Sequence, residues 1–257
     1  MMNPWIIEIE IEGESRVLEK LEPLLRSSPR MLLQRGERYY ELRSSEFDSE
    51  ADPNTVRAIA KRLIRLISAS CRLEFGLQGR ILIRGIKRLE KEKPPTQFLF
   101  VDAPIPRPWG ENLAPVRKDG IDSSHGFLEL AIELISSGDS EDIEKVIGMW
   151  DRDVSFRDLT PILEIIKKDV GGIKGIAERK WASKADVENI FHTAQSPAIL
   201  GDEARHGIQR GIPPSKPIGL EAAREVTAKI IRRWLAEKSA AKGWAASSGA
   251  LRGKAEA

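Results

Sequence analysis

The chain has 257 residues, of which 41% are hydrophobic and 31% are charged, a composition typical of soluble globular proteins. Its 41 basic and 39 acidic residues leave a formal net charge of +2, so the chain as a whole attracts nucleic acid only weakly over long range. No apolar run approaches the roughly 20 residues that a membrane span requires. The single cysteine, Cys71, excludes an internal disulfide and a cysteine-based zinc site.

The N-terminus leads straight into an alternating pattern and lacks the basic region and apolar segment of a secretory signal. Together with the lone cysteine, this favours a cytoplasmic protein. We expect no membrane contact, no metal site and no cofactor.

The first hundred residues mix strand and helix patterns. Residues 5–12 alternate isoleucine with glutamate, which predicts a half-buried strand. A helix follows from Ser15, and residues 31–42 predict a hairpin because Arg35-Gly36 interrupts them. Two further strands are expected at 80–89 and 97–101. The order of these patterns predicts an α+β fold class with antiparallel pairing.

The clearest helix begins at Asp52-Pro53, where Asp52 can cap the helix and Pro53 suits its first position. Arg57, Lys61 and Arg65 recur every four residues and therefore line one face of this helix. That face is either a nucleic-acid contact or simply a solvated helix surface. Just beyond the apolar stripe of this helix, Cys71 is expected to be a small buried residue.

The stretch from 104 to 122 carries several prolines and no clear period, so we expect it to link two modules. The predicted organisation is an α+β module at 1–103, this linker, a helical bundle at 123–237 and a disordered tail at 238–257.

Beyond residue 123 the apolar residues recur only at helical spacing. Ser155 with Asp158 and Ser183 with Asp186 indicate two helix starts. The helix that begins at Ser155 is expected to end at Gly171-Gly172. A final amphipathic helix is expected to begin near Leu220.

The loop from Gln195 to Pro217 is long for a helical bundle and contains Arg205-His206 near its middle. In one interpretation Arg205 clamps a phosphate and His206 transfers a proton. In the other, His206 anchors the loop and Arg205 pairs with Asp202 or Glu203. His192, on the preceding helix, is a further candidate for the site, whereas His125 is expected to have no chemical role.

The segment from Ala204 to Gly207, followed by a proline-containing loop and the helix that opens at Ile218 to Arg224, resembles the end of HEPN domains (higher eukaryotes and prokaryotes nucleotide-binding). With Trp181 and Phe191, the same run also resembles a group of uncharacterised bacterial proteins. The resemblance covers about 123–237. It implies a dimeric, metal-independent ribonuclease of a toxin or phage-defence system. In that family Arg and His are four to six residues apart, whereas Arg205 and His206 are adjacent, so we expect binding rather than turnover.

Two main functions follow as hypotheses, beside a third in which the protein senses a small molecule or nucleotide and the Arg205 loop holds its phosphate. The first is an RNA-binding or RNA-cleaving effector with catalytic residues Arg205 and His206 and with contacts to RNA or a nucleotide from His192, Asp202 and Glu203 and from Arg57, Lys61 and Arg65. The alternative is a non-catalytic interaction or dimerisation protein in which the Arg-His loop is structural. We expect a homo-oligomer, formed through Trp234 and Leu235 of the final helix.

Overall fold

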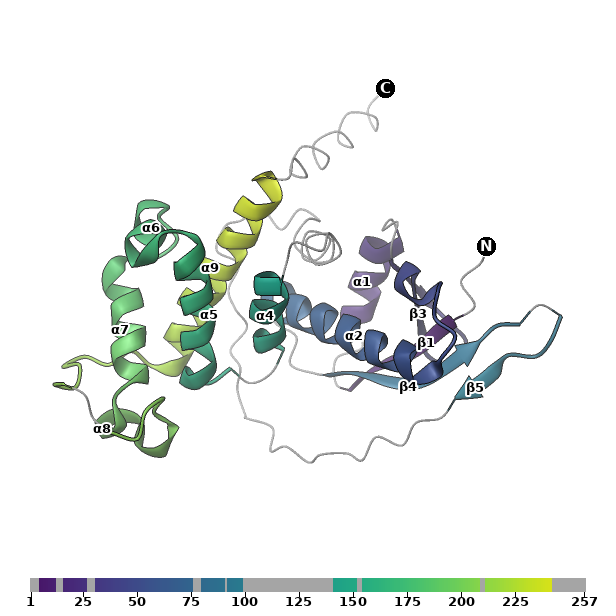
Figure 1. Ribbon diagram of the computed structural model, residues 1–257, viewed down its shortest axis with the longest axis horizontal. Coiled ribbons are helices and arrows are strands. Elements are labelled where there is room, and N and C mark those ends of the chain that lie inside the picture. Colours follow the sequence, from purple (N-terminus) through teal and green to yellow (C-terminus); the bar gives the residue numbers. More distant parts are fainter. Residues whose placement is uncertain are drawn as a thin grey trace, which may run out of the picture. The chain divides into compact units, whose positions relative to one another are not determined.

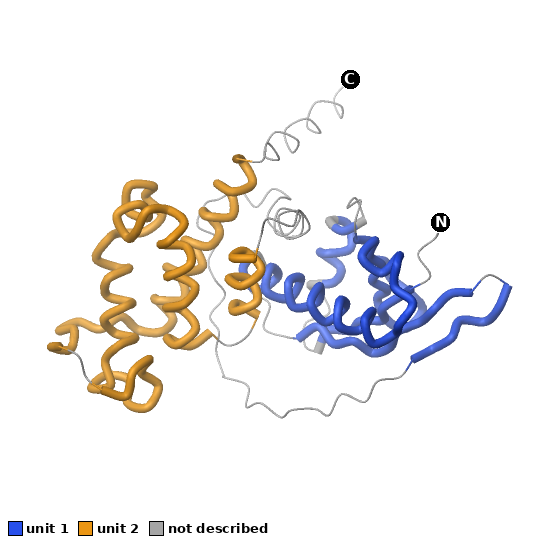
Figure 2. The backbone as a smooth tube through the Cα atoms, in the orientation of Figure 1, with its two compact units in different colours: residues 1–112 blue, residues 113–257 orange. Residues whose placement is uncertain are grey.

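A computed structural model gives the fold of the protein (Figure 1). The residues that it describes are 5–12, 16–26, 31–75, 80–90, 92–98, 141–151, 154–208 and 211–241. The chain divides into two compact units, 1–112 and 113–257 (Figure 2), and each is described by itself below. An antiparallel sheet in the first unit followed by helices in the second confirms the α+β class. The predicted linker at 104–122 and His125 lie outside the described residues.

The first unit is built on a five-stranded antiparallel sheet with the strand order β2-β3-β1-β4-β5. Its elements are β1 (Trp5–Glu12), α1 (Arg16–Arg26), β2 (Met31–Arg35), β3 (Tyr40–Ser44), the short 3-10 helix η1 (Ser45–Phe47), α2 (Pro53–Phe75), β4 (Arg80–Arg88) and β5 (Thr96–Phe98). The first four strands and two helices follow the split βαβ pattern of ferredoxin-like folds. The predicted hairpin is confirmed as β2 and β3.

The central strand β1 follows the predicted alternation, and on its polar face the Glu10 side chain is 44% exposed. Ile7 and Ile9 are at most 1% exposed, as the alternation requires, but Glu8 between them is also buried. Its carboxylate lies 2.5 Å from the Nζ of Lys87 on the neighbouring β4. A Cβ on Gly85 would come within 2.6 Å of the Glu8 Oε2, so glycine at that position makes room for the carboxylate.

The long helix α2 begins as predicted. The Asp52 carboxylate accepts hydrogen bonds from the backbone N–H groups of Asn54 and Thr55, at 3.3 and 3.0 Å, and Pro53 occupies the first helical position. The helix continues past its predicted apolar stripe to Phe75. It therefore includes Cys71, whose predicted burial is confirmed.

The described part of the second unit is helical: α4 (Glu141–Trp150), α5 (Phe156–Asp169), α6 (Gly172–Glu178), α7 (Lys184–Ala194), α8 (Pro197–Leu200), the 3-10 helix η2 (Gly201–Glu203) and α9 (Leu220–Ala241). Helix α5 is central, because it contacts α4, α6, α7 and α9. Both predicted helix starts are confirmed. The Asp158 carboxylate accepts from Ser155, and the Ser183 hydroxyl accepts from the Asp186 N–H.

The corner between α5 and α6 depends on glycine. Gly171 and Gly172 have φ angles of 84° and 92°, which L side chains rarely adopt, so α5 ends where the sequence predicts. The sequence pattern did not predict the short helix α6 that follows. It can form because Gly175 lets the chain pack against the carbonyl of Val170, where an added Cβ would lie 1.8 Å from the oxygen.

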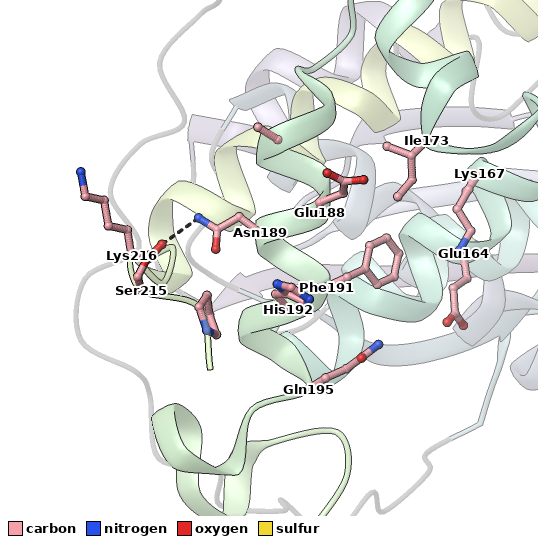
Figure 3. A pocket seen from close by; sticks show the side chains of 12 residues that line it. Glu164, Lys167, Ile173, Glu188, Asn189, Phe191, His192, Gln195, Ser215 and Lys216 are labelled. Carbon is pink, nitrogen blue, oxygen red and sulfur yellow. Dashed lines mark hydrogen bonds between the residues drawn. The ribbon is translucent and has the colours of Figure 1, made fainter. Parts of the chain in front are cut away.

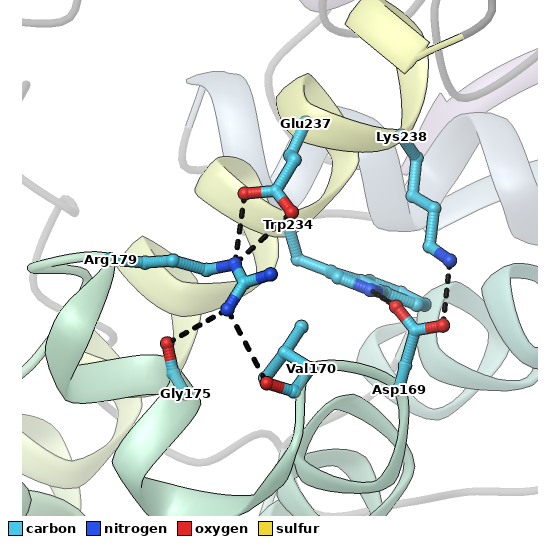
Figure 4. A network of polar contacts seen from close by, with 7 residues as sticks. All are labelled: Asp169, Val170, Gly175, Arg179, Trp234, Glu237 and Lys238. Atoms are coloured by element: carbon cyan, nitrogen blue, oxygen red, sulfur yellow. Dashed lines mark hydrogen bonds and ion pairs between the residues drawn. The ribbon is translucent and has the colours of Figure 1, made fainter.

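The final helix α9 extends to Ala241, so the prediction that the tail starts at 238 was wrong for residues 238–241. The reason is a polar network on its last turns (Figure 4). The Asp169 carboxylate accepts from the indole Nε1 of Trp234 at 2.8 Å and pairs with the Nζ of Lys238 at 2.7 Å. Arg179 binds both carboxylate oxygens of Glu237 at 3.1 Å. Trp234 is 1% exposed, so it belongs to the core of the unit rather than to a surface for self-association.

Candidate functional site

Arg205 is held by helix α5 and by the end of α7. Its guanidinium donates to both carboxylate oxygens of Glu164, at 2.6 and 3.3 Å, and its backbone N–H donates to the carbonyl of Ala194 at 2.8 Å. The predicted pairing with Asp202 or Glu203 was therefore wrong. Both of those residues are exposed, and the carboxylate that the arginine reaches lies 41 residues earlier in the sequence.

The segment just before Arg205 is anchored by a second arginine. Arg157, in the first turn of α5, donates from Nε to the carbonyl of Ala204 at 3.3 Å and from its terminal nitrogen to the carbonyl of Asp202. Asp202 therefore contributes its backbone rather than its carboxylate. The predicted loop of 195–217 is also less irregular than expected, because α8 and η2 form its first third.

We call the described residues 204–208 and 211–219, between η2 and α9, the Arg205 loop. Helix α7 fixes its far end. Asn189 donates from its side-chain nitrogen to the Lys216 carbonyl at 3.0 Å, and the Thr193 hydroxyl accepts from the Ile218 N–H at 3.2 Å. The Arg205 loop is thus tied at its start to α5 and at its end to α7.

Two large apolar side chains project from the middle of this loop. Ile208 is 75% exposed and Ile212 is 91% exposed, and within the described ranges no other large hydrophobic residue is classed as exposed. Burying an isoleucine side chain typically contributes about 1.5–3 kcal/mol, so leaving two exposed on an anchored loop needs an explanation. Sequence periodicity could not identify them, because both lie in a loop with no period.

An open groove of about 730 Å³ lies beside the Arg205 loop (Figure 3). We call it the α7 groove, and it is lined by Glu164 and Lys167 of α5, Ile173 of α6, Ala185, Glu188, Asn189, Phe191 and His192 of α7, Gln195, and Pro214, Ser215 and Lys216 of the Arg205 loop. The Nζ of Lys167 lies 4.9 Å from the centre of the Phe191 ring, a cation–π contact. Apolar and charged side chains of both signs therefore share this surface.

The three candidate side chains of the loop region do not converge on one cavity. His192 is exposed and lines the α7 groove, but neither Arg205 nor His206 is among the residues that line it. His206 is exposed. The sequence missed Glu164 and Arg157, which hold the loop, because no local spacing links a helix residue to a loop more than 40 positions later.

The basic candidates Arg57, Lys61 and Arg65 lie on α2, in the first unit. Lys61 and Arg65 are exposed and Arg57 is half-buried, as expected for one helix face. The structure therefore does not place them in the same unit as the Arg205 loop.

The face of the sheet opposite the core of the first unit carries cross-strand polar pairs. Beside Glu8 and Lys87, the Arg84 Nε lies 2.5 Å from the Glu10 carboxylate, and Gln34 donates to Glu41 at 2.9 Å. Sheets of this topology that bind RNA do so by stacking bases on aromatic side chains. The aromatic residues of the described strands, Trp5, Tyr40 and Phe98, lie on the other face by their register.

In the described ranges no group of three or more His, Cys, Asp or Glu side chains is placed to hold a metal ion. None of the helices described there combines the length and the hydrophobicity needed to cross a bilayer. Comparison with family models, with curated proteins and with solved structures gives no match to this chain. The resemblance to HEPN domains therefore stays a prediction.

Proposed function

We propose that the helical unit is a non-catalytic protein-interaction module, in which Arg205 braces the loop that presents Ile208 and Ile212 to a partner. The observation that carries the proposal is the two-point contact between the Arg205 guanidinium and the Glu164 carboxylate. A planar guanidinium that binds a carboxylate through two parallel hydrogen bonds is fixed in place, which suits a structural role.

The same contact argues against Arg205 as a clamp for phosphate. To bind an anion, the guanidinium would have to leave Glu164 or accept the anion beside an existing carboxylate, and either arrangement weakens the attraction. His206 lies outside the α7 groove, so a substrate in that groove would not meet the pair expected for proton transfer.

The test compares stability with activity toward RNA for the full chain. Arg205→Ala and Glu164→Ala each remove the brace, so both are expected to lower the melting temperature by about 2–5 °C, consistent with the loss of about 1 kcal/mol. His206→Ala removes an exposed imidazole and is expected to leave stability unchanged. Lys168→Ala removes an exposed cation elsewhere on α5 and serves as the matched control.

RNA integrity and RNA affinity at low salt are measured for the same set. We expect no cleavage and no difference in affinity between Arg205→Ala and Lys168→Ala, because each variant removes one positive charge. RNA cleavage that disappears in Arg205→Ala and His206→Ala, with unchanged melting temperatures, would overturn the proposal in favour of an RNA-cleaving effector.

A further inference from the structure

The most exposed large apolar side chain of the described residues is close in sequence to a residue that lines the α7 groove. Ile212 is 91% exposed, and Pro214, only two residues later, lines the groove. The chain therefore places a protruding apolar residue two positions before a residue of the groove wall.

The recess can receive an aliphatic side chain. Phe191 and Ile173, both half-buried, together with Ala185 and Pro214, supply apolar surface within a volume of about 730 Å³. Ile212 does not bury its own side chain in this recess, since it is 91% exposed. None of the described residues of this chain covers it, and a second molecule that binds here would remove it from water.

The surface is also suited to a copy of itself. In a two-fold symmetric interface the same surface patch of both copies is buried, and every contact occurs twice. A surface with a protrusion next to a recess can therefore bind a copy of itself, because each protrusion enters the other copy's recess. Charges of both signs line the groove: Glu188 pairs with Lys184 of its own helix at 3.5 Å, in an exposed contact that a copy rotated by 180° can exchange for Lys216 of the other protomer.

We propose that the α7 groove binds the Arg205 loop of a second copy of this chain, with each Ile212 inserted against Phe191 and Ala185 of the other protomer. This inference rests on the proposed function, since it names the partner of the loop that Arg205 braces. The braces from Glu164, Asn189 and Thr193 hold the loop before binding, which lowers the entropy lost when the copies associate.

Sedimentation equilibrium of the full chain between about 1 and 100 µM measures the dimer, over the range where weak protein contacts become populated. Ile212→Asp places a charge in the apolar contact, and Ala185→Arg fills the groove from an exposed position in the first turn of α7. Each is expected to raise the dimer dissociation constant at least about tenfold, because both symmetric contacts are lost. Ala222→Arg, the same change at an exposed position in the first turn of α9, is the matched control and should leave the dissociation constant unchanged.

Mixing the two variants provides a decisive second measurement. A heterodimer of Ile212→Asp with Ala185→Arg retains one intact contact, an unmodified loop in an unmodified groove, so it should form more tightly than either variant alone. A monomeric wild-type chain at about 100 µM, or a dimer that both variants leave intact, would overturn the inference. Neither result bears on whether Arg205 braces the loop, so the proposed function is tested separately by the stability and RNA measurements.

Discussion

Arg205 and Glu164, 41 residues apart in sequence, join the Arg205 loop to α5 through hydrogen bonds of 2.6 and 3.3 Å. Their side chains are 29% and 41% exposed, so the pair lies at the surface, where an ion pair typically contributes up to about 1 kcal/mol. The contact ties the start of the Arg205 loop to α5, and this is the basis of our proposal that Arg205 braces the loop that carries Ile208 and Ile212.

Asp169 is expected to stabilise the end of α9. Asp169→Ala leaves the buried indole N–H of Trp234 without its acceptor and removes the partner of Lys238, for an expected loss of about 1–2 kcal/mol. Urea denaturation followed by tryptophan fluorescence measures it. Lys238→Ala keeps the acceptor of Trp234 and should therefore cost less; an equal or larger cost would contradict the importance assigned to the indole contact.

The same carboxyl gives a pH dependence with a defined sign. Burial acts to raise the pKa of Asp169, but hydrogen bonds from Lys238 and Trp234 and the charges of Lys238 and Arg179 outweigh it and hold the pKa below the ordinary value of 3.8. Its stabilising contribution is therefore complete above that ordinary value and is lost as the pH falls through the lowered pKa. The stability difference between wild type and Asp169→Asn should shrink on acidification, and a difference that grows would contradict this assignment.

Gly175→Ala is expected to destabilise the helical unit by about 2 kcal/mol or more, because the new Cβ would overlap the Val170 carbonyl oxygen at 1.8 Å. Gly207→Ala is the matched control: a Cβ there meets nothing within 4 Å, so a change within about 0.5 kcal/mol is expected. Thermal unfolding of both variants checks the prediction, and equal melting temperatures would show that the α5–α6 corner is not closely packed.

Lys180→Gly is expected to stabilise the protein by up to about 1 kcal/mol. Lys180 has a φ angle of 57°, and the N–H groups of Lys180 and Trp181 donate to the carbonyls of Ala177 and Ile176, the Schellman pattern at a helix end that favours glycine. Lys180→Ala retains the Cβ and should bring no such gain. A gain for alanine equal to that for glycine would show that the left-handed backbone carries no strain.

The sequence predicted most elements of the fold because their signals are local. Asp52-Pro53, Ser155 with Asp158, and Gly171-Gly172 each act on the backbone within a few residues, and the structure agrees at all three. Burial of Glu8 was missed because it depends on Lys87, which the fold brings to the neighbouring strand. The extension of α9 was missed for the same reason, because Asp169 holds Lys238 across the unit.

The candidate site was predicted less well than the fold. The sequence drew attention to Arg205 as a residue with a specific role, but the choice between chemistry and structure depended on a partner that the sequence could not identify. Asp202 and Glu203 are closer to Arg205 in sequence than Glu164 is. In the structure, however, Arg205 binds the carboxylate of Glu164 on α5. Another residue of α5, Arg157, binds the backbone carbonyls of residues 202 and 204. The exposure of Ile208 and Ile212 could not be predicted either, because both lie in a loop whose sequence has no period.

The most direct test of the central claim, that Arg205 is a structural brace, is a double-mutant cycle with Arg205→Ala, Glu164→Ala and the double variant. The measured quantity is the free energy of unfolding, determined by urea denaturation of the full chain. We predict a coupling energy of about 0.5–1 kcal/mol, as expected for a partly exposed ion pair with two hydrogen bonds. A coupling energy of zero would contradict the claim, because the two side chains would then contribute to stability independently.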